Sequence, residues 1–427
     1  MKYFLWALGC QMNKSDGERI AATLESLGYQ KTKDEREANL IGVVACSVRQ
    51  TAIDRIYGKI AEWNTWKNER PLTTFVSGCM LPADQEKFLK KFDLVFKVDD
   101  LASLPELLGQ DGATVPAAYW QVEPKWSSHF EAYITIQNGC DKFCTYCAVP
   151  YTRGRERSRP SQEILDEIRG LAEKGYTHFT LLGQNVNSYG LDKPGEEISF
   201  AELLRQTAKI EGDFWVHFTS PHPRDMTDEV LQVIAQYPKL ANQIHLPLQA
   251  GDDLVLKRMN RPYTQAQFLA QVERFRNILP TADLSTDCIV GFPGETREQF
   301  EQTVKVFKTA KFDMAYIAKY SPRPGAVSSR FADNVPKEEK EERWKILTEV
   351  LRQTALEKSQ TFVGKTIRVL VDGYDRAGFL TGKNEGLKIV RINQKESPAS
   401  TALVGTFVDV IICSARPFSL SGDLVLS

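Results

Sequence analysis

The 427-residue chain lacks any apolar run long enough to cross a membrane. A membrane-spanning helix needs about 20 consecutive apolar residues, and no stretch approaches that length. Residues 1–6 read as the start of a strand and lack the apolar core and small-residue cleavage site of a signal peptide. We therefore expect a soluble, cytoplasmic protein with no membrane partner.

The chain also lacks an excess of charge of either sign, because 54 Lys and Arg residues face 55 Asp and Glu residues. The net charge therefore indicates no partner, and any nucleic-acid surface must come from local clusters. Cysteine is sparse, and eight residues are too few for a disulfide scaffold. Six of the eight lie in arrangements that suit metal, which favours a reducing compartment.

Three of these cysteines, Cys140, Cys144 and Cys147, form a CxxxCxxC triplet. Three thiolates in one short loop can hold three irons of a [4Fe–4S] cluster and leave the fourth iron open. Zinc is an alternative, but a structural zinc prefers four ligands, and no fourth Cys or His lies in this loop. Unliganded thiols are a further alternative. The pattern favours a cluster, and the amino and carboxylate groups of S-adenosylmethionine, a cofactor of radical chemistry, can chelate its open iron.

The first segment, residues 1–115, repeats a short apolar run that ends at or near a cysteine. Helical patterns follow the first two runs, so we expect a parallel sheet with right-handed crossovers. Because such strands all end at one edge, Cys10, Cys46 and Cys79 should meet there. Each of them alone also fits a small buried packing residue. Their common position favours a second three-cysteine cluster.

Residues 126–357 follow an interrupted stretch at 112–130, interpreted as a linker, and again alternate strands and helices. Six such units predict a partial barrel of parallel strands with its site at the C-terminal strand ends. The CxxxCxxC loop follows the first expected strand. Each polar or glycine residue after a later strand fits a loop or cap as well as a cofactor contact. The candidates for holding S-adenosylmethionine are Tyr146, Gln184, Asn185, Ser220, Gln249, Asp287 and Gly291.

Four arginines, Arg153, Arg155, Arg157 and Arg159, alternate after the cluster loop. A guanidinium fork suits phosphate or carboxylate, so the run predicts a substrate clamp. If the segment is extended, Arg153 and Arg157 share one side, and Arg155 and Arg159 share the other. A solvated basic loop is the alternative.

Residues 359–427 read as short strands separated by glycine-containing turns, which predict a small β-barrel. Its slight excess of basic residues fits an ordinary solvated surface about as well as RNA binding. The whole chain is thus expected to be an α/β protein with three parts. These are an N-terminal parallel α/β domain (1–115), a central partial (β/α)6 barrel (126–357) and a C-terminal small β-barrel (359–427).

Several stretches resemble a known family. The CxxxCxxC loop is similar to that of the radical S-adenosylmethionine superfamily, and the three spaced cysteines before it resemble those of its methylthiotransferases. Within these, the chain looks most like the MiaB-type enzymes that modify tRNA. The matching stretches are LGCQMN (8–13), CSVR (46–49), PYTRGRERSRP (150–160), LLGQNVNSYG (181–190), HLPLQ (245–249), MNR (259–261), STD (285–287), GFPGE (291–295) and YSPRPG (320–325).

The resemblance implies a radical S-adenosylmethionine methylthiotransferase that adds a methylthio group to C2 of N6-isopentenyladenosine beside the tRNA anticodon. It implies two [4Fe–4S] clusters, one at the CxxxCxxC loop that cleaves S-adenosylmethionine and one at the other three cysteines that supplies the sulfur. The C-terminal part resembles the RNA-binding TRAM domain. The implied partners are the tRNA anticodon stem-loop, an electron donor such as flavodoxin or ferredoxin, and a sulfur source.

Two other functions stay open. One is a methylthiotransferase for a ribosomal protein or for threonylcarbamoyl-adenosine in tRNA, and the other is a metal-stabilised RNA-binding protein without catalysis. The chain also departs from the family pattern in two places. Val44 and Ala45 precede Cys46 where the family usually has Asn-Thr, and QAGDD at 249–253 replaces QSGSD. Both changes leave all six cysteines in place.

Overall fold

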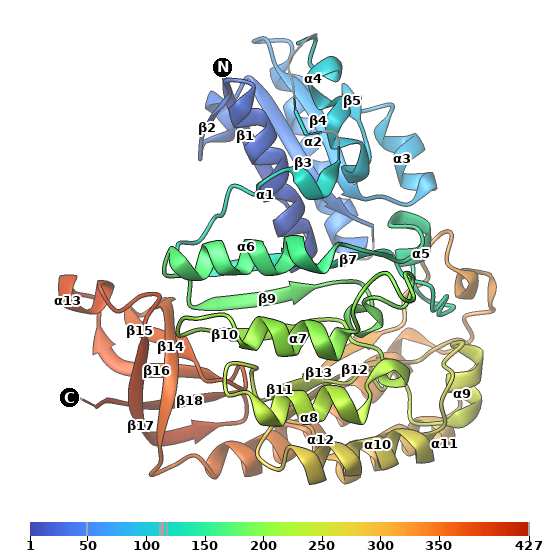
Figure 1. The fold of residues 1–427 in the computed structure, drawn as a ribbon. Helices are drawn as coiled ribbons and strands as arrows, with labels where there is room; N and C mark the ends of the chain where they lie inside the picture. The colour runs from blue at the N-terminus through green and yellow to red at the C-terminus, as the bar shows by residue number, and fades with distance from the viewer. Residues whose placement is uncertain (48–49, 111–114, 117, 426–427) are drawn as a thin grey trace. The chain divides into compact units, whose positions relative to one another are not determined.

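The computed structural model describes residues 1–47, 50–110, 115–116 and 118–425 and shows a mixed α/β architecture (Figure 1). The described chain divides into two compact units. The N-terminal unit holds Met1–Ser128, Tyr133–Arg159 and Pro322–Ser329, and the C-terminal unit holds His129–Ala132, Pro160–Ser321 and Arg330–Ser427. Parts of the expected linker and of the CSVR stretch, at 111–114, 117 and 48–49, lie outside the described residues.

A five-stranded sheet in the order β2-β1-β3-β4-β5 lies in the N-terminal unit, and its parallel pairing confirms the predicted parallel sheet. The strands are β1 (Lys2–Ala7), β2 (Gln30–Lys31), β3 (Leu40–Cys46), β4 (Thr73–Cys79) and β5 (Leu94–Val95). Every residue of β3 is buried, which explains its continuous apolar run. A Cβ on Gly42 of β3 would lie 2.0 Å from the ring of Phe75, so only glycine fits there.

Helices α1 (Gln11–Ser26) and α2 (Gln50–Trp66) follow β1 and β3 and supply two separate apolar cores. Ile20 and Leu24 of α1 are fully buried in one core, and Ile56, Ile60 and Trp63 of α2 are fully buried in the other. The remaining elements of this unit are short. They are α3 (Pro82–Phe88), α4 (Leu104–Leu107), β6 (Glu131–Thr135), β7 (Gln137–Asn138), α5 (Val149–Thr152) and β8 (Arg157–Ser158). The first two residues of β6 belong to the C-terminal unit.

Parallel strands alternate with helices through the middle of the C-terminal unit (Figure 1). Strand β9 (His178–Leu182) pairs with β10 (Trp215–Phe218), and β12 (Asp283–Val290) pairs with both β11 (Gln243–His245) and β13 (Met314–Lys319). These pairings confirm the predicted parallel strands. The helices are α6 (Ser161–Glu173), α7 (Phe200–Ala208), α8 (Asp228–Gln236), α9 (Asp253–Arg258), α10 (Gln265–Ile278), α11 (Arg297–Ala310) and α12 (Lys337–Gln360).

Side-chain caps determine where α10 and α11 begin. Thr264 precedes α10 and Thr296 precedes α11, and each makes a reciprocal capping box with a glutamine, Gln267 or Gln299. Each box satisfies two backbone groups that a helix N-terminus would leave without partners.

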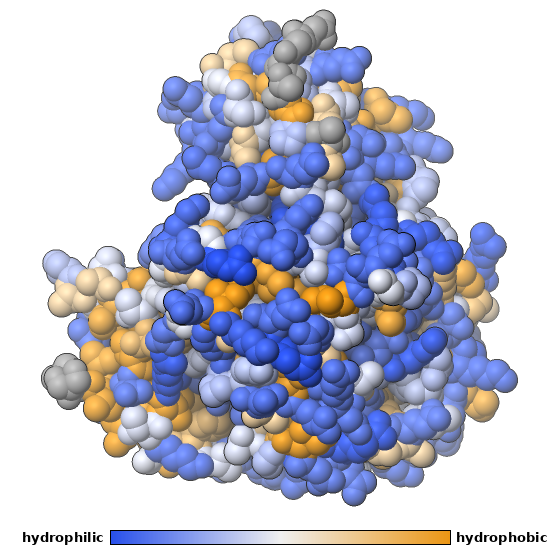
Figure 2. All heavy atoms as spheres, viewed as in Figure 1, coloured by the Kyte–Doolittle hydropathy of each residue, from blue (hydrophilic) through white to orange (hydrophobic). Residues whose placement is uncertain are grey.

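Polar side chains cover most of the face in Figure 2. Among the described residues, no helix combines the length and apolar character needed to span a bilayer.

The last part of the chain is a closed five-stranded barrel in the order β14-β15-β16-β18-β17, as expected. Its core consists of alternate side chains of the strands, including Val369, Val390 and Val410. The strands are β14 (Thr366–Tyr374), β15 (Phe379–Lys383), β16 (Ile389–Lys395), β17 (Phe407–Arg416) and β18 (Ser419–Leu424), with α13 (Pro398–Thr401) between β16 and β17.

The loop from Asn384 to Lys388 docks this small barrel onto the parallel strands of the same unit. A Cβ on Gly386 would lie 1.9 Å from Asp283 Oδ2, so glycine is required at this contact. Close by, His217 Nε2 lies 2.9 Å from the carbonyl oxygen of Glu385. Lys388 is buried with its Nζ 3.9 Å from Asp313 Oδ1. The docking therefore depends on buried polar groups.

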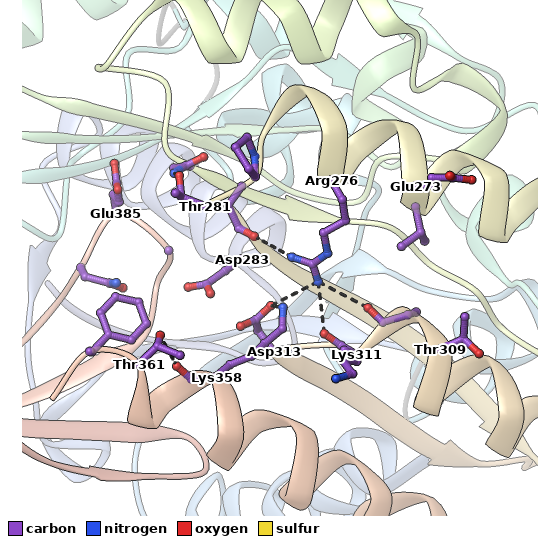
Figure 3. Close-up of a pocket in the computed structure, with 18 of the residues that line it drawn as sticks. Glu273, Arg276, Thr281, Asp283, Thr309, Lys311, Asp313, Lys358, Thr361 and Glu385 are labelled. Carbon is purple, nitrogen blue, oxygen red and sulfur yellow. Dashed lines mark hydrogen bonds and ion pairs between the residues drawn. The ribbon is translucent and has the colours of Figure 1, made fainter.

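A cavity of about 1060 Å³ lies beside this contact, at the N-terminal ends of β12 and β13. Figure 3 shows residues that line it. Its wall includes Arg276, Asp283, Asp313 and Lys358. Burial raises the pKa of Asp283 to about 8, with the neighbouring Asp313 as a further cause. Asp313 also faces desolvation, but its hydrogen bonds and Lys358 lower its pKa. In parallel α/β barrels the functional sites lie at the opposite, C-terminal ends of the strands. This cavity lies at the N-terminal ends, where residues contribute to stability.

Candidate active site

The first cysteine set gathers at the C-terminal edge of the N-terminal sheet. Cys46 and Cys79 end β3 and β4 as direct register partners, and Cys10 is the N-cap of α1 just beyond β1. The turn before Cys10 lies against Cys46, since a Cβ on Gly9 (φ +104°) would lie 2.8 Å from Cys46 Sγ. Among the described residues, no three Cys, His, Asp or Glu side chains form a group ready to hold a metal ion. The structure thus brings these cysteines to one edge, and their role as ligands stays a prediction.

Asn13, one turn into α1, connects all three strand ends and is fully buried. Its Nδ2 donates to the carbonyl oxygens of Leu8 (2.6 Å) and Ala45 (2.7 Å). Its Oδ1 lies 3.4 Å from Cys79 Sγ. One amide therefore holds the turn after β1 against β3 and β4.

A buried ion pair lies beside this edge. Asp16 is fully buried and pairs with Arg153, whose side chain is 4% exposed. Tyr119 donates its hydroxyl to Asp16 Oδ1 over 2.6 Å, and Arg153 donates from Nε to Cys79 Sγ over 2.9 Å. Burial raises the pKa of the Cys79 thiol to about 12, although Arg153 acts to lower it. Bound iron would require the thiolate, which the nearby guanidinium favours, so the residues present fit a metal–thiolate group.

Glycine shapes the CxxxCxxC loop. A Cβ on Gly139 (φ +84°) would lie 2.0 Å from the carbonyl oxygen of Arg155, and the Cys140 N–H donates to Gly154 over 3.1 Å. Burial raises the pKa of Cys140 to about 12, and the backbone N–H of Lys142 acts against it. The charges of Cys147, Glu156 and Cys144 raise this pKa further. The three thiols lie in one short loop, and their role as cluster ligands stays a prediction.

Three of the candidate cofactor residues adopt left-handed backbone at successive strand ends of the C-terminal unit. They are Ser220 (φ +59°) after β10, Gln249 (φ +67°) after β11 and Gly291 (φ +70°) after β12. This conformation costs roughly 1–2 kcal/mol for a residue with a side chain, and such strain clusters at functional sites. Two backbone hydrogen bonds also join Gln249 to β12. Its N–H donates to the carbonyl oxygen of Asp287 (2.8 Å), and its carbonyl oxygen accepts the N–H of Ile289 (2.9 Å).

The other candidates have defined neighbours. Asn185 is buried and donates to Asp225 Oδ2 over 3.2 Å, and Gln184 beside it is partly exposed. Asp287 is 41% exposed at its side chain, with His245 Nε2 3.2 Å from its Oδ2. Tyr146 is partly exposed and belongs to the N-terminal unit, whereas the other six belong to the C-terminal unit.

The arginine run does not alternate as predicted. Arg153 and Arg159 are buried, whereas Arg155 and Arg157 have side chains that are 74% and 54% exposed. The segment is not a continuous strand, because α5 ends at Thr152, Gly154 has φ +75° and β8 spans two residues. The prediction that Arg153 shares a side with Arg157 is therefore wrong.

The two exposed arginines are held by carboxylates of the same unit. Arg155 Nε lies 2.7 Å from Asp141 Oδ1, and its guanidinium lies 5.6 Å from the ring centre of Phe143. Arg157 pairs with Asp99. A phosphate could replace either partner at modest cost, because exposed ion pairs contribute only about 0–1 kcal/mol.

Sequence reasoning missed four residues with site contacts: Asn13, Asp16, Tyr119 and His245. A signal was present for the first two, because Asn13 and Asp16 are spaced three residues apart on the helix after Cys10 and so share a face. Tyr119 gave no such signal, since it lies far along the chain from Asp16.

Comparisons with known proteins agree along the whole chain. Residues 134–307 match the radical SAM superfamily, residues 2–98 match a group described as uncharacterized protein family UPF0004, and residues 360–425 match the TRAM domain. The chain is 40% identical to tRNA-2-methylthio-N(6)-dimethylallyladenosine synthase of Carboxydothermus hydrogenoformans, over 99% of each chain. It is 38% identical to the protein of that name from Acetivibrio thermocellus, over 99% of this chain and 91% of the relative.

Solved structures share the fold at low sequence identity. The radical S-adenosylmethionine methyltransferase TsrM from Kitasatospora setae superposes with a TM-score of 0.54 at 16% identity, covering 74% of this chain and 72% of TsrM. The cobalamin-dependent S-adenosylmethionine radical enzyme OxsB gives a TM-score of 0.54 at 12% identity, covering 83% of this chain and 56% of OxsB. Both similarities concern the fold alone.

Proposed function

The chain belongs to the radical S-adenosylmethionine methylthiotransferases that modify tRNA, and we propose that it adds a methylthio group to C2 of N6-isopentenyladenosine beside the anticodon. The observation that carries this function is the 38–40% identity, over nearly the full chain, to synthases of that modification. The chemistry is consistent, because an unactivated aromatic C–H has no practical acid–base route and a radical enzyme can act on it.

This family uses S-adenosylmethionine and a [4Fe–4S] cluster. We propose that Cys140, Cys144 and Cys147 hold that cluster, supported by their CxxxCxxC spacing in one short loop shaped by Gly139 and by the match of residues 134–307 to the radical SAM superfamily. When bound, such a cluster supplies the electron for reductive cleavage of S-adenosylmethionine.

We propose a second iron–sulfur site at Cys10, Cys46 and Cys79, which would hold the sulfur to be transferred. Its support is the shared sheet edge, together with Asn13 and Arg153, which place amide and guanidinium groups beside Cys79. Polar donors near cluster sulfurs are the usual way in which a protein orients and tunes such a group.

We propose that the strand-end residues hold S-adenosylmethionine. Ser220, Gln249 and Gly291 support this proposal because each adopts left-handed backbone at a strand end, where such strain is typical of functional sites. The exposed carboxylate of Asp287 is available for a hydroxyl or an amino group of the cofactor, and His245 orients it. Gln184 and Asn185 belong to the same proposed set in the C-terminal unit, and Tyr146 is retained as a separate candidate within the N-terminal unit.

The substrate is tRNA, as the relatives' names and the TRAM match imply. We propose that Arg155 and Arg157 contact its phosphates. The three-domain division at 1–115, 126–357 and 359–427 is retained as a proposal. The reaction also needs electrons and sulfur, so we propose a low-potential electron donor, such as flavodoxin or ferredoxin, and a sulfur source as further partners.

Nucleoside analysis of bulk tRNA tests the function directly. A strain that lacks this chain should accumulate N6-isopentenyladenosine without the 2-methylthio group, and a plasmid copy should restore the modified nucleoside. Unchanged methylthio content in the deletion strain would contradict the proposed substrate. Loss of a different methylthiolated residue would assign another substrate of the same chemistry.

A further inference from the structure

One short segment contacts a cysteine of each set. Arg153 donates from Nε to Cys79 Sγ over 2.9 Å, and the next residue, Gly154, accepts the backbone N–H of Cys140 over 3.1 Å. Both contacts lie inside the N-terminal unit. The sheet edge that carries Cys79 is thereby joined to the entry of the CxxxCxxC loop.

The guanidinium of Arg153 is held rigidly at this point. It pairs with Asp16, and a second nitrogen donates to Asn13 Oδ1 over 3.1 Å. Tyr119 holds Asp16 from another side, with its hydroxyl 2.6 Å from Oδ1. The side chains of Arg153 and Asp16 are 4% and 0% exposed, so water does not compete for these bonds.

This arrangement exceeds what packing requires. Burying an ion pair costs desolvation energy, and apolar residues of similar volume often stabilise a fold as well or better. The hydrogen-bonding groups of Asp16 and Asn13 could find partners without a donor that also contacts the Cys79 sulfur. The planar fork of arginine, however, reaches the carboxylate, the amide and the sulfur together, which lysine cannot do. The contact to Cys79 therefore indicates a role toward whatever that sulfur binds.

We propose that Arg153 is a positioning residue that hydrogen-bonds the Cys79 sulfur and sets the reduction potential of the iron–sulfur group proposed for Cys10, Cys46 and Cys79. The inference rests on the proposed function of that cysteine set. Hydrogen bonds to cluster sulfurs and a nearby positive charge both stabilise the reduced form, which carries more negative charge. Losing the guanidinium should shift the potential to a more negative value.

The test uses the full chain in a Cys140→Ala/Cys144→Ala/Cys147→Ala background, so that only the N-terminal set can bind iron. After anaerobic reconstitution, iron and sulfide are counted, and the potential is measured by titration followed with EPR. Arg153→Gln leaves the Asp16 charge buried and unpaired, so Arg153→Gln/Asp16→Asn, which removes both charges, is measured as well. Arg153→Lys keeps the charge but loses the fork.

Arg169→Gln is the matched control, because it removes an exposed guanidinium that belongs neither to the cysteine sets nor to the proposed binding residues. We expect all these variants to retain iron. The potential should shift downward in Arg153→Gln and by smaller amounts in Arg153→Lys and in the double variant, where loss of the Asp16 charge acts in the opposite direction, while Arg169→Gln should match the background. Iron bound with an unchanged potential in both Arg153→Gln and the double variant would overturn the role of Arg153 alone. Absence of iron in the background with Arg153 intact would overturn the N-terminal site itself, and this inference with it.

Discussion

Cys46 and Cys79 end adjacent parallel strands as register partners, and the N–H of Ser47 donates to the carbonyl oxygen of Cys79 over 2.8 Å. This pairing fixes the two cysteines on one edge before any metal binds. The first set is therefore prepared by the sheet itself, whereas the CxxxCxxC set is prepared by a loop shaped by Gly139 and Gly154. Because a sheet edge prepares one set and a loop prepares the other, we expect two separate iron sites.

Iron content should report these sites separately. The fully reconstituted protein should hold about eight irons per chain if each set carries one [4Fe–4S] cluster. Changing Cys140, Cys144 and Cys147 together to Ala should halve the iron, measured by colorimetric assay. Changing Cys288 to Ala is the control, since this buried cysteine belongs to neither set. Loss of all iron, or no loss, would count against separate sites.

Cofactor cleavage should separate from product formation. The Cys10→Ala/Cys46→Ala/Cys79→Ala variant should still form 5′-deoxyadenosine from S-adenosylmethionine but make no methylthio product, because radical generation needs only the loop set. Both compounds can be quantified by mass spectrometry from one reaction with reductant and tRNA. Full methylthio product from this variant would refute the sulfur-supplying role.

The exposed arginines should matter for tRNA more than for the cofactor. A charged hydrogen bond to phosphate contributes roughly 1.5–3 kcal/mol when well formed, so Arg155→Ala/Arg157→Ala should weaken tRNA binding at least about tenfold. Formation of 5′-deoxyadenosine without tRNA should change little. Arg169→Ala is the control, because Arg169 is similarly exposed (49%) and paired with Asp166 on α6. Parent-like tRNA affinity in the double variant would mean that the run is a solvated loop.

RNA binding by the small barrel is best tested with point substitutions. Deleting 359–427 would uncover Trp215, whose ring centre lies 4.7 Å from that of Phe407, and would remove the partners of His217 and Asp283. On β16, Arg391 lies 3.7 Å from the ring centre of Phe379, and Lys395 lies 5.1 Å from it. These cations and the ring form a surface suited to phosphate and base stacking.

Arg391→Ala and Lys395→Ala should each lower tRNA affinity and reduce the slope of log affinity against log salt by about one unit. Fluorescence anisotropy at several salt concentrations measures both effects. Lys311→Ala, an exposed lysine after α11 (61%), serves as the control. An unchanged salt slope in both variants would show that these side chains do not contact RNA phosphates.

Stability should fall with rising pH because of Asp283. Its folded-state pKa of about 8 lies above the unfolded value near 4, so the folded state holds an extra proton between these values. The free energy of unfolding then decreases by up to about 1.4 kcal/mol per pH unit as pH rises toward 8. The lowered pKa of Asp313 has the opposite effect. The ionised carboxylate of Asp313 stabilises the fold, and this contribution to the free energy of unfolding is lost as the pH falls into the acid range.

Asp283→Asn keeps the shape of the protonated carboxyl and should remove this slope. The variant should match the parent near pH 5 and exceed its unfolding midpoint in urea near pH 8. Arg276, Lys358 and Lys388 also face the pair, so the absolute stability depends on them as well. Asp409→Asn, at an exposed carboxylate of β17, should retain the parental slope. A parental slope in Asp283→Asn would contradict the assignment.

Local sequence was sufficient to predict the parallel strands, the small C-terminal barrel and the strand-edge positions of Cys10, Cys46 and Cys79, whereas the role of both cysteine sets as ligands stays a prediction. Strand periodicity is a local property, and parallel strands share one edge whatever their separation in sequence, so Cys10, Cys46 and Cys79 could be placed together in advance. The strand-end positions of Ser220, Gln249 and Gly291 followed from the same rule, although their left-handed backbone did not.

Only the tertiary structure decided what the arginines contact. Alternation assumes an extended chain, and the turn at Gly154 turns Arg153 inward to Asp16 while Arg155 and Arg157 remain exposed. The Tyr119–Asp16 bond and the Gly386–Asp283 contact join positions far apart in the sequence. Their formation depends on which surfaces meet after the sheets and barrels have packed. No local pattern encodes such a meeting, because the energy of a buried polar contact depends on the partner that burial provides.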